Sequence, residues 1–237
     1  MLHNAVMTRP PHRTTVRLTG IALRHQGTHD SLCAYYAAAM LLCALRPELE
    51  ESFDAAHVGL DPLFANLPRP RSRSVAEVAA EWLTSGVKLR ALGRALNRAC
   101  AHGPWQTRFA YRAVGRGDDT VALIREQIDR GLPCVLGWES EELGNHTALV
   151  IGYERFARSR SRWLRLLDPI RIQDVLEWGQ LARLARPHVE LLWCRRHDGV
   201  RPDKLTVTRD GDGELVGNAV ERWEPEPASW RPLLPRP

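Results

Sequence analysis

The chain has 237 residues, of which 44% are hydrophobic and 26% are charged, so it can bury a core of its own. Its formal net charge is +5, but nearly all basic residues are arginine, and we interpret the basic runs as solvated loops rather than as a nucleic-acid surface. No uncharged stretch reaches the roughly 20 residues of a membrane-spanning helix, and the N-terminus lacks the apolar segment of a secretory signal. We therefore expect a cytoplasmic protein with no membrane or nucleic-acid partner.

The pattern of apolar residues predicts helices and strands in alternation, with a run of strands in the second half. In chain order we expect an extended segment at 14–23, helices at 31–46, 74–83 and 89–101, a strand at 105–114, a helix at 118–131, strands at 133–138, 146–153 and 162–168, a helix at 175–185, a strand at 188–195 and a hairpin within 204–217. This order indicates an α+β fold. We divide the chain into a flexible N-terminus (1–13), one domain (14–198), and a C-terminal hairpin with a proline-rich tail (199–237).

The stretch HQGTHDSLCAYYAAAMLLCAL (25–45) changes from a polar loop to an apolar helix at Cys33. A helix that is apolar on every side is typical of the middle of a domain. At its N-terminus, unpaired backbone N–H groups and the helix dipole favour a thiolate. Cys33 is therefore a candidate nucleophile, although a small buried cysteine with no chemical role, as we expect for Cys43, fits this segment equally well.

Three further residues strengthen the case for chemistry at Cys33. Gln26 lies in the preceding loop, where its amide could stabilise an oxyanion. His146 begins one predicted strand and Asp168 ends the next. If these two strands pair as an antiparallel hairpin, His146 and Asp168 come together, and a carboxylate beside a histidine orients it as a base.

These motifs, Q-x6-C at the start of a buried helix, then HTALVIGY and LLDP, resemble those of the papain-like cysteine peptidases, most closely the double-glycine leader peptidase branch. The resemblance implies a helical lobe led by the nucleophile's helix and packed on an antiparallel sheet lobe. It also implies that Cys33 is the nucleophile, His146 the general base and acid, Asp168 the orienting residue and Gln26 the oxyanion donor. The chain differs from the family in having Ala34 where glycine is usual.

The resemblance implies a thiol-dependent hydrolase that cleaves a peptide, isopeptide or amide bond through a thioester on Cys33, with a peptide or protein as substrate. Neither a cofactor nor a metal is required. The same residues would also suit an acyltransferase or transamidase, and a catalytically inactive peptide-binding protein is the non-enzymatic alternative. His25 could replace Gln26 as the oxyanion donor. His25 and His29 with Cys33 could also be read as metal ligands, but Gly27 and the loop context argue against the helical i, i+4 face that this would need.

The five cysteines, at positions 33, 43, 100, 134 and 194, are odd in number, widely spaced and form no CxxC pair. This spacing argues against a disulfide framework and against a structural zinc site. The tail RWEPEPASWRPLLPRP (222–237) combines two tryptophans with five prolines. We expect either a segment that docks on the domain or a frayed end.

Overall fold

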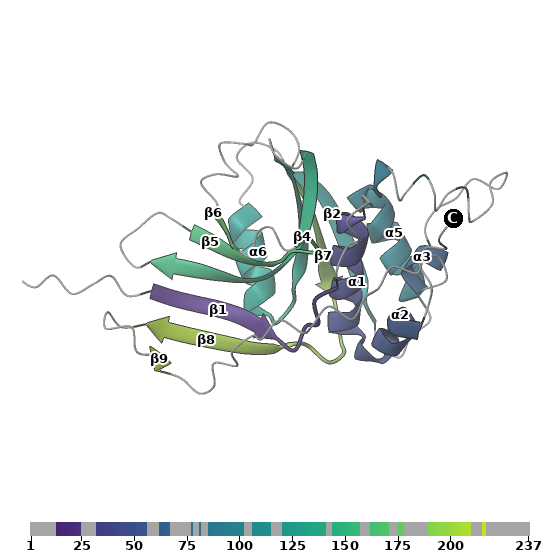
Figure 1. Ribbon diagram of the computed structural model, residues 1–237. Helices are drawn as coiled ribbons and strands as arrows, with labels where there is room; N and C mark the ends of the chain where they lie inside the picture. The colour runs from purple at the N-terminus through teal and green to yellow at the C-terminus, as the bar shows by residue number, and fades with distance from the viewer. Residues whose placement is uncertain are drawn as a thin grey trace, which may run out of the picture.

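The structure is a computed structural model, in which the chain folds as helices packed on an antiparallel sheet (Figure 1). It describes residues 13–24, 32–55, 62–66, 77, 81, 85–101, 106–114, 120–140, 144–156, 162–170, 175–177, 189–209 and 215–216. The predicted oxyanion loop at Gln26 and the proline-rich tail lie outside these residues, as does most of the helix expected at 74–83. Among the described parts of the chain, none of the helices combines the length and hydrophobicity that a membrane span requires.

The helices are α1 (Cys33–Leu45), a short 3-10 helix (Pro47–Leu49), α2 (Glu50–Ala55), α3 (Pro62–Ala65), α5 (Leu89–Ala99) and α6 (Thr120–Asp129). The strands are β1 (Arg13–Thr19), β2 (Arg108–Val114), β3 (Cys134–Ser140), β4 (Gly144–Phe156), β5 (Arg162–Leu167), β6 (Val175–Glu177), β7 (Val189–Arg196), β8 (Asp203–Arg209) and β9 (Leu215–Val216). The coarse α+β class predicted from the sequence is confirmed.

Helix α1 is buried along nearly its whole length, as its uniformly apolar sequence predicts. It contacts β3, β4 and α5, so it packs on the sheet beside α5 (Figure 1). The helix ends at Arg46, whose backbone N–H donates to the carbonyls of Leu42 and Cys43, and Pro47 cannot continue it. The C-terminal end of α1 is thereby fixed at Arg46.

Helix α5 is amphipathic and covers the edge of the sheet formed by β2 and β7. Its buried residues include Leu89, Leu92 and Leu96, whose spacing places them on one face, whereas Arg90 and Arg94 are exposed. This pattern is the reason that one face of the helix packs on the sheet while the other meets solvent.

Within the described residues the strands form one sheet, ordered β2-β7-β3-β4-β1-β8-β9, with β5 and β6 branching from β4. The long strand β4 pairs antiparallel with β3 through its first half and with β1 and β5 through its second half. Helix α6 lies across the sheet from α1 (Figure 1). β4 is thus the central strand, and the candidate site lies at its beginning.

The second half of β4 lies very close to β1 at one glycine. A β-carbon on Gly152 would overlap the carbonyl oxygen of Val16, and Gly152 is paired with Arg17 in the register of the two strands. A side chain at this position would therefore force the two strands apart.

The hairpin expected after residue 203 is present, since β8 pairs antiparallel with β9. Strand β8 also pairs with β1 along the full length of β1. Lys204 on β8 donates to the backbone carbonyl of Asp129 at 3.1 Å, at the end of α6. The hairpin is therefore joined to the same sheet and to one of its covering helices.

The prediction of a helix at 175–185 is wrong for its first three residues, because Val175–Glu177 forms strand β6. These residues pair with β5, with Leu176 opposite Leu164 and Leu176 only 2% exposed. Pairing with a neighbouring strand outweighs the helical spacing of the apolar residues, because it buries Leu176 and satisfies backbone hydrogen bonds. Residues 178–185 lie outside the described residues.

Candidate functional site

Cys33 is the first residue of α1, at the position where a helix presents backbone N–H groups and the positive end of its dipole. The preceding residue, Leu32, has no side chain that could cap these N–H groups. Cys33 is 9% exposed, so it lies at the margin of the core rather than deep inside it. This is the position that the sequence predicts for a reactive thiol.

His146 and Asp168 are brought together by the antiparallel pairing of β4 and β5 that the sequence predicts. Leu149 lies opposite Leu167, so Asp168, which directly follows β5, lies beside the first part of β4. His146 Nε2 donates to Asp168 Oδ1 at 3.0 Å, because a carboxylate can only accept. Both side chains are almost fully buried, which protects this hydrogen bond from competition by water.

The carboxylate of Asp168 is held by its own turn. The backbone N–H of Ile170 donates to the same Oδ1 atom at 3.0 Å. Such an Asx turn is the ordinary local role of an aspartate before a proline, here Pro169. The turn fixes the carboxylate, and the fixed carboxylate in turn fixes the orientation of the His146 ring.

The imidazole of His146 also lies near Cys33, whose side chain helps to raise the pKa of His146. Since Nε2 faces Asp168, the nitrogen left for the thiol is Nδ1. The structure thus brings together three of the four predicted site residues, Cys33, His146 and Asp168, from α1, β4 and the end of β5. The fourth, Gln26, lies outside the described residues, as do His25 and His29.

The electrostatics of the site favour the protonated form of His146. Burial, the largest influence, lowers the pKa of His146, but the hydrogen bonds to Asp168 and Cys33 and the charges of both groups together raise its pKa from 6.5 to about 9. The imidazole therefore carries a proton at neutral pH, next to a sulfur atom and held by a carboxylate.

Trp138 is a fourth constituent of the site that sequence analysis missed. It lies directly opposite His146 in the pairing of β3 and β4, and the two rings meet edge to face with their centroids 4.9 Å apart. Trp138 is only 3% exposed, so it shields one side of the imidazole from water. The loop between the two strands indicates a hairpin, but the register that pairs these residues becomes visible only in the structure.

All five cysteines are free thiols and all are buried. Burial raises the pKa of the Cys134 thiol and raises the pKa of Cys194 to about 12. The pKa of Cys100 is also raised, again mainly by burial. A protonated, buried thiol is a poor nucleophile, so the surroundings of these three cysteines oppose reactivity.

No group of three or more metal-binding side chains occurs among the residues that the structure describes. Neither a scan of protein-family models nor a search of curated proteins finds a match to this chain. What the site can do must therefore be argued from its geometry: a sulfur atom at a helix N-terminus, a protonated imidazole beside it, and a buried carboxylate that orients the imidazole.

Proposed function

We propose that the protein is a thiol-dependent hydrolase that cleaves a peptide, isopeptide or amide bond through a thioester on Cys33. The observation that carries this proposal is the buried imidazole of His146, which donates to Asp168 Oδ1 at 3.0 Å and whose pKa is raised by both Asp168 and Cys33. A nucleophile, a base within hydrogen-bonding reach and a third group that orients the base are the parts that covalent catalysis requires.

The proposal assigns the proton of the pair to His146 and the negative charge to the sulfur of Cys33. The sulfur attacks the carbonyl carbon of the substrate, and His146 gives its proton to the departing amine, which leaves a thioester. His146 then takes a proton from water as the water attacks the thioester, which releases the carboxylic acid and restores the thiolate of Cys33 beside the protonated His146. Asp168 keeps the ring in place through both steps.

The proposed fold is papain-like, with a helical lobe led by α1 and a sheet lobe that carries His146 and Asp168. This arrangement is supported by the position of Cys33 at the start of a buried helix packed on the sheet. We further propose a peptide or protein substrate and a cytoplasmic location. The cytoplasmic location is supported by the five free cysteines, because free cysteines are typical of a reducing compartment.

Alkylation of the five cysteines by iodoacetamide, followed by mass spectrometry, tests the nucleophile. Cys43 is a matched control within the native protein, because it lies in the same helix and is 8% exposed, against 9% for Cys33. Exposure alone predicts equal labelling, whereas a thiolate paired with His146 predicts that Cys33 reacts about tenfold faster or more. Labelling of Cys100 or Cys134 while Cys33 stays unmodified would contradict the proposal.

Incubation with a peptide library then separates the possible reactions. Cleavage products that depend on Cys33, and that Cys33→Ala abolishes while Cys43→Ala does not, would support hydrolysis. Products that gain an added amine in place of water would indicate acyl transfer on the same thioester. Fast labelling of Cys33 without any turnover would favour the inactive peptide-binding alternative.

A further inference from the structure

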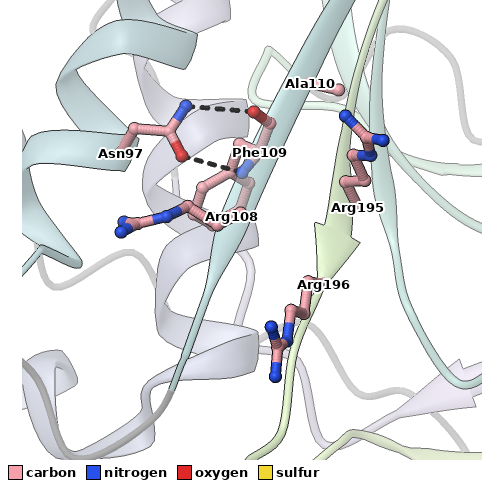
Figure 2. A pocket seen from close by; sticks show the side chains of 6 residues that line it. All are labelled: Asn97, Arg108, Phe109, Ala110, Arg195 and Arg196. Atoms are coloured by element: carbon pink, nitrogen blue, oxygen red, sulfur yellow. Dashed lines mark hydrogen bonds between the residues drawn. The ribbon is translucent and has the colours of Figure 1, made fainter.

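A pocket of about 690 Å³ lies at the edge of the sheet, away from the candidate site (Figure 2). It is formed where α5, the beginning of β2 and the end of β7 meet. Its lining residues are Asn97, Arg108, Phe109, Ala110, Arg195 and Arg196. Three of the six are arginines, so the pocket is strongly cationic.

A β-bulge explains why two consecutive residues of β7 both line this pocket. Phe109 pairs with Cys194 and Arg108 pairs with Arg196, so Arg195 is an extra residue in β7. In a regular strand, consecutive side chains point to opposite faces, but a bulge changes the direction of a side chain locally. Arg195 and Arg196 can therefore both contribute to one rim.

The wall of the pocket is held by Asn97 from α5. Its side chain accepts from the backbone N–H of Phe109 at 2.9 Å and donates to the carbonyl of the same residue at 3.0 Å. Figure 2 shows both hydrogen bonds beside the side chain of Arg108. The edge strand is thereby fixed to the helix, and the pocket has a defined wall.

The positive charge of the pocket is only partly balanced. Arg196 pairs with Asp198 at 3.3 Å, and both side chains are largely exposed to solvent. No carboxylate among the described residues pairs with Arg108 or Arg195. An exposed pair contributes little, so it leaves Arg196 available to exchange Asp198 for another anion.

The pocket is separate from the site at Cys33. On β7, Glu190 lies opposite Gly137, next to Trp138 of the candidate site, whereas Arg196 lies at the other end of the strand. At about 3.3 Å per residue, the length of β7 between Glu190 and Arg196 is roughly 20 Å. A small ligand in the pocket would not reach His146.

We propose that this pocket binds a small ligand that carries two or more oxyanion groups, either phosphates or carboxylates. Guanidinium groups are suited to both, because their N–H groups bond pairs of oxygen atoms. Figure 2 shows the three arginine side chains spread around the strand ends rather than converging on one point. This spread favours a ligand whose negative charges are themselves spread, and the volume suits a molecule of metabolite size.

Isothermal titration calorimetry with two probes, inorganic triphosphate and citrate, tests the proposal and distinguishes the two sources of oxyanion. The titrations use the full chain at an ionic strength of about 0.02 M, where charge interactions are least screened. We expect one binding site for at least one probe. Because the double variant Arg108→Gln/Arg195→Gln removes two of the three guanidinium groups, it should weaken binding about tenfold or more.

Arg90→Gln is the matched control, because it removes the same charge from an exposed position on α5 that does not line the pocket. It should change the affinity less than about twofold, and far-ultraviolet circular dichroism should show that all variants are folded. Failure of both probes to bind, unchanged binding by the double variant, or equal weakening by Arg90→Gln would each overturn the proposal. So would a probe that slows the alkylation of Cys33, since that would place the anion at the candidate site.

Discussion

The stability of the protein should depend on pH through His146, and Asp168→Asn should remove most of that dependence. A pKa raised from 6.5 to about 9 corresponds to about 3 kcal/mol of stability, since each tenfold change in an equilibrium constant is about 1.4 kcal/mol. His146 is only 3% exposed, so solvent screens this contribution little. Because the pKa is higher in the folded protein, the contribution is complete below pH 6.5 and is lost as the pH rises through about 9.

Replacement of Asp168 by asparagine keeps the size of the side chain but removes its charge. Burial, the largest influence on the pKa of His146, then lowers that pKa with less opposition, since only Cys33 still raises it. The quantity to compare is the free energy of unfolding of the wild type minus that of the variant. We expect this difference to be about 2–3 kcal/mol larger at pH 6 than at pH 10.

Urea denaturation followed by tryptophan fluorescence, at pH values from about 6 to about 10, measures this difference. His146→Gln serves as a second variant, because it removes the titrating group and should flatten the pH dependence in the same way. Cysteines and lysines away from His146 that ionise at high pH do so in all three proteins, so their effect cancels. Parallel curves for the wild type and both variants would refute the reasoning.

Substitutions at three positions have further expected outcomes. Asp168→Asn should keep part of the peptide-cleaving activity, because an amide can still accept from the imidazole, whereas Asp168→Ala should lose more; wild-type activity in both would show that another group orients His146. Gly152→Ala should lower the free energy of unfolding by about 2 kcal/mol in thermal or urea denaturation, because its β-carbon meets the carbonyl of Val16. Asn97→Ala should lower the free energy of unfolding by about 1–3 kcal/mol, because it removes both hydrogen bonds to Phe109. It should leave the alkylation rate of Cys33 unchanged.

The meeting of His146 and Asp168 could be predicted from the sequence because it depends on local structure. Two strand patterns separated by a short polar loop favour an antiparallel hairpin, which brings the start of one strand next to the end of the other. The placement of Cys33 at a helix N-terminus was equally local, since it depends on where a polar loop becomes an apolar run.

Features that depend on register or on pairing between distant strands could not be predicted. Trp138 meets His146 only because of the register of β3 and β4, and a shift of one residue would turn Trp138 to the other face. The arginine pocket requires β2 to pair with β7, although β3, β4, β5 and β6 lie between these two strands in the sequence. Val175–Glu177 forms strand β6 because it pairs with the edge of β5. The spacing of apolar residues along the sequence does not reveal this pairing.

The position of the strands in the sheet also determines when the site can form as the protein folds. Cys33 lies on α1, near the start of the chain, and its partner His146 lies on β4, more than a hundred residues later. In the sheet, β4 lies next to β3, and the other neighbour of β3 is β7. Contacts between such distant segments form late, because closing long loops costs entropy before the contacts repay it. The thiol of a growing or partly folded chain is therefore without its imidazole, and alkylation of Cys33 that is faster than that of Cys43 would report completed folding of the sheet.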